Sequence, residues 1–437
     1  MEFKETLSYL LSLGHETLAM KLGLKNTELL LAALGNPHHS FASVQIAGTN
    51  GKGSTAAMLY SLCRRGGLRT GLFTSPHLIS ITERIRIADS DISAREFARL
   101  ATQVKGAAES LIAQGKLETL PTFFEHVTAI ALLAFKEARV ELAILETGLG
   151  GKLDATTVAG AAIVAITPVA LDHQEHLGAT LREIAAEKAA IIRPGTSAII
   201  APQQEEALEV IRQRAAECEV RPLLADYEAL IEGATADGRF TVTLQTKTGR
   251  YESMRIGLRG RHQIENAATA IRIAESLNQH GWKIPQTAIV AGIAAASHAG
   301  RLEIVDGYLF DGAHNPSAVR TLRSYLDEFV KVPLTLVFGV MRDKNLEEMA
   351  AILFPAAVRV VLTQVDNPRS ASVDELREIA AATGAPNVFV TRSVSEALTK
   401  ANEVTSSEGL ICITGSLYLL GEAKEILNAS ALTAKQS

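Results

Sequence analysis

The chain has 437 residues, a length that indicates two or three domains rather than a single core. Its apolar fraction of 47% and charged fraction of 21% are typical of globular proteins and exclude a disordered chain. The net charge of −5 provides no basic field for nucleic acid, so any anionic ligand must be held by local groups.

The three cysteines, Cys63, Cys218 and Cys412, lie far apart and form neither a metal-ligand spacing nor a disulfide framework. The N-terminal sequence MEFKETLSYLL carries acidic residues early and lacks the basic-then-apolar pattern of a secretory signal. No stretch approaches the roughly 18 apolar residues that a membrane helix needs. We therefore expect a reduced, cytoplasmic protein with no nucleic-acid or membrane partner.

The first forty residues predict helices, because apolar residues recur at helical spacing in LSYLLSL and TELLLAALG, up to Gly35–Pro37. An apolar strand at 41–47 then leads into a glycine-rich turn at 48–54 and a helix at 55–65. A second strand follows at 69–75. Strand, turn, helix and strand in this order imply two parallel strands joined by a crossover helix.

The next part of the chain contains strands at 140–145, 161–167 and 197–200, and helices from Gln203 onward and over 262–277. Residues 239–246 alternate between polar and apolar. We expect them to pair with 248–256 as an antiparallel hairpin at a sheet edge.

The small residues of AAASHAG, 294–300, mark a domain boundary that divides the chain into 1–296 and 297–437. Beyond it, amphipathic helices alternate with the apolar strands of GYLFDGAHNP, PLTLVFGV, RVVLTQV, NVFVT and GLICITG. This alternation is typical of an open, mostly parallel sheet covered on both faces. The expected fold class is α/β, with a P-loop-type parallel-sheet ATPase domain followed by a smaller, Rossmann-like α/β domain. The lack of a G-x-G-x-x-G motif disfavours a dinucleotide site.

The strongest local signal is the glycine-rich turn Gly48-Thr49-Asn50-Gly51-Lys52-Gly53-Ser54, which follows a strand and opens a helix. Backbone N–H groups in such a turn face a phosphate, and the helix N-terminus adds positive potential. Lys52 can reach the outer phosphates and Ser54 can contact a magnesium ion. The motif departs from the generic P-loop, since Ile46 stands at the first glycine position and Gly53 separates Lys52 from Ser54. A tight glycine turn without a ligand is the alternative.

Two further groups follow strands, Glu146 directly and Asp172-His173 after a short interval. Ligands of open parallel sheets bind outside the carboxyl ends of the strands, so these side chains are candidate ligand contacts. A solvated loop carboxylate is the alternative for Glu146, and a hydrogen-bonded structural histidine is the alternative for His173. Magnesium prefers oxygen ligands, which makes a histidine ligand unusual.

Lys188 lies in the helical segment IAAEKAAII, where it is either an ordinary surface lysine or a partly buried amine. Burial would lower its pKa and leave a neutral amine able to add carbon dioxide. The segment TFFE, 122–125, offers two rings for core packing or for stacking on a flat heterocycle. Asp311 and His314 end a strand of the second domain and could hold a ribose or a phosphate.

Together these motifs resemble the folylpolyglutamate synthase/dihydrofolate synthase family, a branch of the Mur-ligase superfamily. The match runs from about the N-terminus to TGSLYLLGEAK, with HETLAMKLGLKN a looser part of it. Nine motifs occur in family order: GTNGKGS, TSPHL…ERI, TFFE, ETGLGGKLDAT, LDHQEHLG…EKA, HQIENAATA, GRLE, DGAHNP and TGSLY.

The resemblance implies a role for each site residue. It places the ATP phosphates on Asn50, Gly51, Lys52, Gly53 and Ser54. It places magnesium on Ser75, Glu146 and His173. It implies that Lys188 is carried as a carbamate, and that Lys52, His173 and Lys188 are the catalytic groups. It implies that the groups closing on the nucleotide are Asn266, Arg301, Asp311 and His314. It places the pterin near Thr122, Phe124 and Asp154.

The activity implied is an ATP- and Mg²⁺-dependent ligation of L-glutamate to a folate-type carboxylate through an acyl phosphate. The acceptor would be tetrahydrofolate, dihydropteroate or both, and we expect a monomer. A peptidoglycan Mur-type amino-acid ligase is the first alternative, disfavoured because only about forty residues precede the glycine loop whereas a domain needs roughly 50. A P-loop binding or switch protein is the second, disfavoured by Glu146, His173 and the second α/β domain.

Overall fold

The main sheet of the protein is the framework of the N-terminal domain. The structure, a computed structural model, describes residues 1–14 and 23–434. The sheet has eight strands in the order β4-β3-β2-β5-β1-β6-β7-β8. Their bounds are β1 Ala42–Ala47, β2 Thr70–Phe73, β3 Ile85–Ile87, β4 Ser90–Asp91, β5 Leu142–Glu146, β6 Ile163–Ile166, β7 Ser197–Ile200 and β8 Leu223–Leu224. The strands from β2 to β8 in this order are parallel, and β3 and β4 extend one edge in antiparallel fashion.

Helices cover both faces of this sheet because alternate residues of its buried strands point to opposite sides. In β5, Leu142 and Ile144 face one core, whereas Ala143 and Leu145 face another. The first core contains α3 Lys52–Arg65, α9 His262–Gln279 and α10 Gln286–Ala295. The opposite face is covered by α1 Phe3–Ser12, α2 Lys25–Ala33, α4 Ala94–Ala113, α5 Phe123–Glu137, α7 Leu181–Ala189 and α8 Glu205–Glu217. The expected parallel sheet with crossover helices is confirmed.

A separate three-stranded antiparallel sheet corrects one expectation. It contains β9 Glu228–Ala234, β10 Phe240–Gln245 and β11 Arg250–Arg255. The hairpin of β10 and β11 forms as expected, but it does not extend an edge of the main sheet. Instead Phe240, Val242 and Leu244 pack into one core with residues of α9 and α10. Strand β9 was missed because all its residues are exposed and give no alternating pattern.

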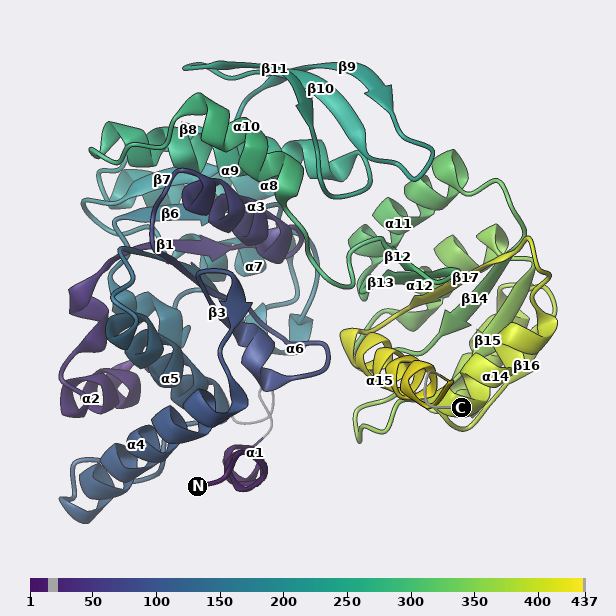
Figure 1. Cartoon of the computed structure of the whole chain (residues 1–437), viewed down its shortest axis with the longest axis horizontal. Coiled ribbons are helices and arrows are strands. Elements are labelled where there is room, and N and C mark those ends of the chain that lie inside the picture. The colour runs from purple at the N-terminus through teal and green to yellow at the C-terminus, as the bar shows by residue number, and fades with distance from the viewer. Residues whose placement is uncertain (15–22, 435–437) are drawn as a thin grey trace.

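The C-terminal domain, green to yellow in Figure 1, lies beside the N-terminal domain and is built on a six-stranded sheet of order β12-β13-β17-β14-β15-β16. Its strands are β12 Glu303–Val305, β13 Tyr308–Asp311, β14 Leu334–Phe338, β15 Arg359–Leu362, β16 Val388–Val390 and β17 Leu410–Thr414. Only β12 pairs in antiparallel fashion. The helices are α11 Pro316–Phe329, α12 Leu346–Leu353, α13 Val373–Ala382, α14 Val394–Val404 and α15 Leu417–Ala434. The α/β fold class of both domains is confirmed.

The linker between the domains runs from the end of α10 at Ala295 to the start of β12 at Glu303. The boundary expected at 296/297 falls in this linker. Of the loosely matching segment HETLAMKLGLKN, residues 15–22 lie outside the described residues. None of the helices within 1–14 and 23–434 combines the length and the apolar character that crossing a membrane requires.

Candidate active site

Two adjoining cavities lie where the carboxyl ends of the main sheet's strands face the C-terminal domain. The P-loop cavity, about 160 Å³, is lined by residues 48–54 together with Glu146, His173, Lys188, Asn266, Arg301, Asp311 and His314. The larger cavity, about 280 Å³, is lined among others by Thr122, Phe124, Asp154, His176, Met341 and Lys344. Ser75, His173 and His314 line both cavities, so the two spaces meet there. Every site residue named from the sequence borders one of them.

The glycine-rich turn connects β1 to α3, and each of its three glycines, Gly48, Gly51 and Gly53, lies too close to a neighbour for a side chain to fit without a shift. A Cβ on Gly48 would lie 1.9 Å from Thr167 Oγ1, and one on Gly51, whose φ is +85°, would lie 2.5 Å from Asn266 Oδ1. Lys52 Nζ donates to Gly48 O at 3.2 Å and to Thr49 O at 3.3 Å. Both bonds are long, so the ammonium is available to a phosphate that enters the turn.

Glu146 ends β5 and is only 5% exposed. Its Oε2 accepts one long hydrogen bond, 3.3 Å, from the backbone N–H of Ser75. Burial raises the pKa of Glu146, opposed by the charge of Lys52, the Ser75 hydrogen bond and the charges of Arg301 and Arg84. A buried carboxylate with so few donors has free lone pairs, which suits a hard cation.

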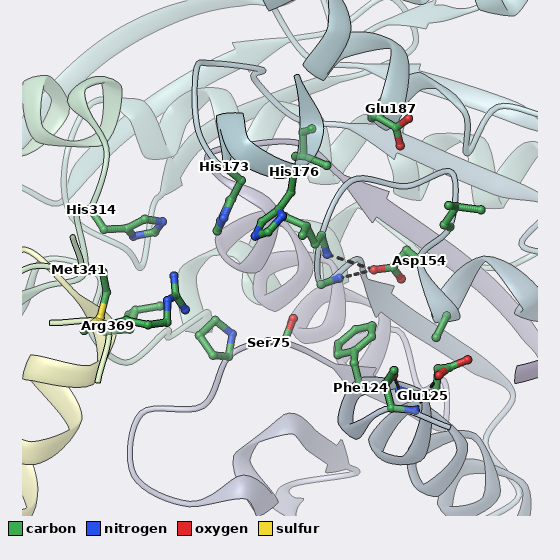
Figure 2. A pocket seen from close by; sticks show the side chains of 18 of the residues that line it. Ser75, Phe124, Glu125, Asp154, His173, His176, Glu187, His314, Met341 and Arg369 are labelled. Carbon is green, nitrogen blue, oxygen red and sulfur yellow. Dashed lines mark hydrogen bonds between the residues drawn. The ribbon is translucent and has the colours of Figure 1, made fainter. Parts of the chain in front are cut away.

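The other two expected magnesium ligands, Ser75 and His173, are also compatible with a cation beside Glu146, although the three do not form an acidic cluster. In Figure 2 the Ser75 hydroxyl and the His173 ring are directed into the cavity from different sides. Burial lowers the pKa of His173 to about 3, so its ring is neutral at pH 7 and has a lone pair. Within the described part of the chain, no three His, Cys, Asp or Glu side chains gather as a metal centre. An ion held by Glu146 and Ser75 would therefore keep water or phosphate oxygens.

Lys188, on α7, is a buried lysine rather than an ordinary surface lysine. It is 4% exposed, and its Nζ donates to Gly48 O at 2.8 Å. Burial, followed by the charge of Lys52, lowers its pKa to about 7. A substantial share of this amine is therefore neutral at physiological pH.

The C-terminal domain supplies the opposite wall of the P-loop cavity. Asp311 accepts hydrogen bonds from the N–H groups of Leu302 (2.9 Å) and Ala313 (3.0 Å), so its carboxylate shapes the turn after β13. Burial raises the pKa of Asp311, while the nearby charge of Arg301 lowers it. His314 Nδ1 lies 2.7 Å from Gly312 O, which orients its ring.

The three residues expected near a pterin, Thr122, Phe124 and Asp154, form part of the wall of the larger cavity. Thr122 caps α5 and forms a reciprocal pair of hydrogen bonds with Glu125. The Phe124 ring stands so close to Gly148 that a Cβ there would lie 2.6 Å from it. Asp154 accepts from the N–H groups of Gly148 (2.7 Å) and Leu149 (3.1 Å), drawn as dashed lines in Figure 2. Phe124 thus offers a ring face, whereas Thr122 and Asp154 hold the loops around it.

Three residues join the two domains at this site, namely Asp172, Asn315 and Lys344, and sequence reasoning missed the contacts between them. The Asp172 carboxylate lies 2.6 Å from Lys344 Nζ and 3.0 Å from Asn315 Nδ2. Asp172 was noticed only as the neighbour of His173. The only available signal for Lys344 was a charged loop, MRDKN, after an apolar strand.

Glu146→Gln tests the cation site, because it removes the charge and keeps the shape. We expect activity to fall about 10²-fold and the magnesium concentration for half-maximal activity to rise about tenfold or more. A magnesium titration of initial rates measures both. Glu118→Gln, an exposed loop residue, is the matched control. An unchanged titration in Glu146→Gln would exclude Glu146 as a ligand.

Comparison with known proteins places these features in context. The Mur ligase middle domain matches residues 46–274, and the Mur ligase, glutamate ligase domain matches residues 300–417. Dihydrofolate synthase/folylpolyglutamate synthase of Bacillus subtilis is 34% identical over 424 residues, which cover 95% of this chain and 97% of that protein. A probable bifunctional folylpolyglutamate synthase/dihydropteroate synthase of Haloferax volcanii is 35% identical over 97% of this chain, which spans only 50% of that longer protein.

Among solved structures, Escherichia coli FolC in complex with DHPP and ADP has a TM-score of 0.86 to this chain. The two are 28% identical, and the match covers 99% of each. The likeness therefore extends over both domains and across the two cavities between them.

Proposed function

The chain belongs to the Mur ligase family, in its folylpolyglutamate synthase and dihydrofolate synthase branch, and on this premise we propose that it is an ATP-dependent ligase that adds L-glutamate to a folate-type carboxylate. The resemblance seen in the nine sequence motifs is confirmed. The peptidoglycan alternative is set aside, since relatives named dihydrofolate synthase/folylpolyglutamate synthase align over 95% and 97% of this chain.

The observation that carries the proposal is the junction of the two cavities at Ser75, His173 and His314. The P-loop cavity offers Lys52 and the helix N-terminus to phosphates. The larger cavity offers Phe124 and a mainly apolar wall, which suits a flat heterocycle. A carboxylate carried by that heterocycle would meet the outermost phosphate of a nucleotide at the junction.

The proposed reaction follows from the proximity of the carboxylate and the outermost phosphate. A carboxylate oxygen attacks the γ-phosphorus of ATP, the bond to the β-phosphate oxygen breaks, and an acyl phosphate and ADP result. Because the attack joins two anions, Lys52 contributes positive charge, and a magnesium ion on Glu146, Ser75 and His173 would supply the rest. The neutral amine of glutamate then attacks the acyl carbon and phosphate departs. Enclosure between the two domains excludes water, which would hydrolyse the acyl phosphate.

Incubation of the purified chain with ATP, Mg²⁺, glutamate and either dihydropteroate or tetrahydrofolate tests this proposal. We expect phosphate release that requires both glutamate and the pterin substrate, and a product heavier by one glutamyl residue in the mass spectrum. The choice between the two acceptors is read from the same experiment. Phosphate release that is indifferent to both substrates would refute the ligase and favour a nucleotide-binding protein.

Two further features remain part of the proposal. A cytoplasmic location fits Cys63, Cys218 and Cys412, which are all buried and free. We also propose that the protein is a monomer.

A further inference from the structure

Asp172 contacts three residues of the C-terminal domain at the site, and the proposed reaction gives these contacts no role. It follows β6 in the N-terminal domain, and its side chain is 6% exposed. Its Oδ1 lies 2.6 Å from Lys344 Nζ, whose side chain is also 6% exposed. Its Oδ2 accepts from Asn315 Nδ2 at 3.0 Å and lies 3.5 Å from His314 Nε2. All three partners belong to the C-terminal domain.

These partners reach both cavities. Asn315 caps α11 and also exchanges contacts with Asn50 in the P-loop, through Nδ2 to Oδ1 at 3.1 Å and through Oδ1 to Nδ2 at 3.5 Å. His314 lines both cavities, and Lys344 lines the larger one. A single carboxylate thus ties the phosphate-binding turn, the junction and the larger cavity to the C-terminal domain.

We propose that Asp172 is a positioning residue for the ligation, which rests on the proposed function: its carboxylate holds the C-terminal domain closed over the P-loop and fixes Lys344 in the wall of the larger cavity. The charge matters more than the shape. Asp172→Asn would leave the buried Lys344 ammonium with Asp343, at 3.4 Å, as its nearest remaining acid. A buried charge that loses its partner is strongly destabilised, and the domains can relieve this by separating.

A second ion pair between the domains provides a matched control. Arg261, at the start of α9, donates to Glu328 on α11, with its Nη2 at 2.7 Å from Oε1. These side chains are 57% and 33% exposed, and Arg261 borders neither cavity. Exposed ion pairs of this kind contribute little to stability. Glu328→Gln therefore removes one contact between the domains and leaves the site unchanged.

The experiment is a double-mutant cycle on the full chain, with Asp172→Asn, Lys344→Met and the double variant. We expect Asp172→Asn to lower kcat/KM for glutamate about 10²-fold, while in the Lys344→Met background the same change lowers it less than about threefold. Glu328→Gln is expected to change kcat/KM less than about threefold. Independent, multiplicative effects of Asp172→Asn and Lys344→Met would overturn the proposal, as would an equal loss in Glu328→Gln.

Small-angle scattering of the unliganded proteins supplies a readout that does not depend on catalysis. We expect a larger radius of gyration for Asp172→Asn than for the wild type and Glu328→Gln, because the domains open. If Asp172→Asn does not fold, Lys344→Met is expected to show the same expansion. An unchanged radius in a folded variant would overturn the proposal even if the wild type proved not to be a ligase. Lack of ligase activity in the wild type, with expansion in the variant, would instead refute the proposed function alone.

Discussion

Replacing Lys52 by alanine is expected to lower turnover about 10³-fold or more while the protein remains folded. Lys52 opens α3, and its ammonium makes two long hydrogen bonds to carbonyls of its own turn. No core packing depends on it. In the proposed reaction it lies where charge builds up on the transferred phosphoryl group, and no other lysine of the P-loop turn can replace it.

Steady-state ATP turnover with both substrates measures this effect, and thermal unfolding monitors the fold. Lys116→Ala is the control, since it removes an exposed lysine from the loop after α4. We expect the control to retain normal turnover. Turnover within about threefold of the wild type in Lys52→Ala would refute the P-loop assignment, because a phosphate-bearing charge contributes far more than that.

The glycine-rich turn could be located from the sequence because its constraints are local. A strand, a turn with glycines at set positions and a helix lie within 24 residues, from Ala42 to Arg65. Gly48 and Gly51 are required by close approaches of Thr167 and Asn266, and the glycines themselves are visible in the sequence. The same holds for Glu146, whose place at the end of an apolar strand fixes it at the sheet's ligand edge.

The contacts between the domains could not be located in this way. Asp172 and Lys344 are 172 positions apart, and nothing in either local pattern indicates the other. The position of the three-stranded sheet was equally hard to predict. The alternation of Phe240, Val242 and Leu244 indicates an apolar face, but it does not indicate which element packs on that face. The periodicity of a sequence predicts that one face of an element is buried, whereas the element that packs on this face is determined by tertiary structure.

The burial of Lys188 is a further feature that the structure shows and the sequence left open. The segment IAAEKAAII is compatible with a surface lysine as well as a buried one. In the structure the side chain turns toward the P-loop and donates to Gly48 O at 2.8 Å. That placement puts an amine with a lowered pKa next to Lys52, where an anion would be far more favourable than a second cation.

Lys188→Ala is expected to lower turnover about 10²-fold or more, because the resemblance implies that Lys188 acts as a carbamate. Its amine has a pKa of about 7, so the neutral form that adds carbon dioxide becomes dominant as the pH rises above that value. Addition forms an N–C bond, releases a proton and replaces a cation by an anion. That anion would balance Lys52 and attract a cation held by Glu146. Short carboxylates such as acetate are expected to restore part of the activity of Lys188→Ala by occupying the vacated space.

A carbon-13 NMR spectrum of the wild type in labelled bicarbonate at pH 8 provides a direct readout. We expect a carbamate resonance that is missing in Lys188→Ala and that weakens as the pH falls through about 7, since protonation removes the lone pair of the amine. Lys116→Ala should retain the resonance, because Lys116 is exposed and borders neither cavity. A fully active wild type without any such resonance would contradict the carbamate, because the anion beside the P-loop would then have to come from elsewhere.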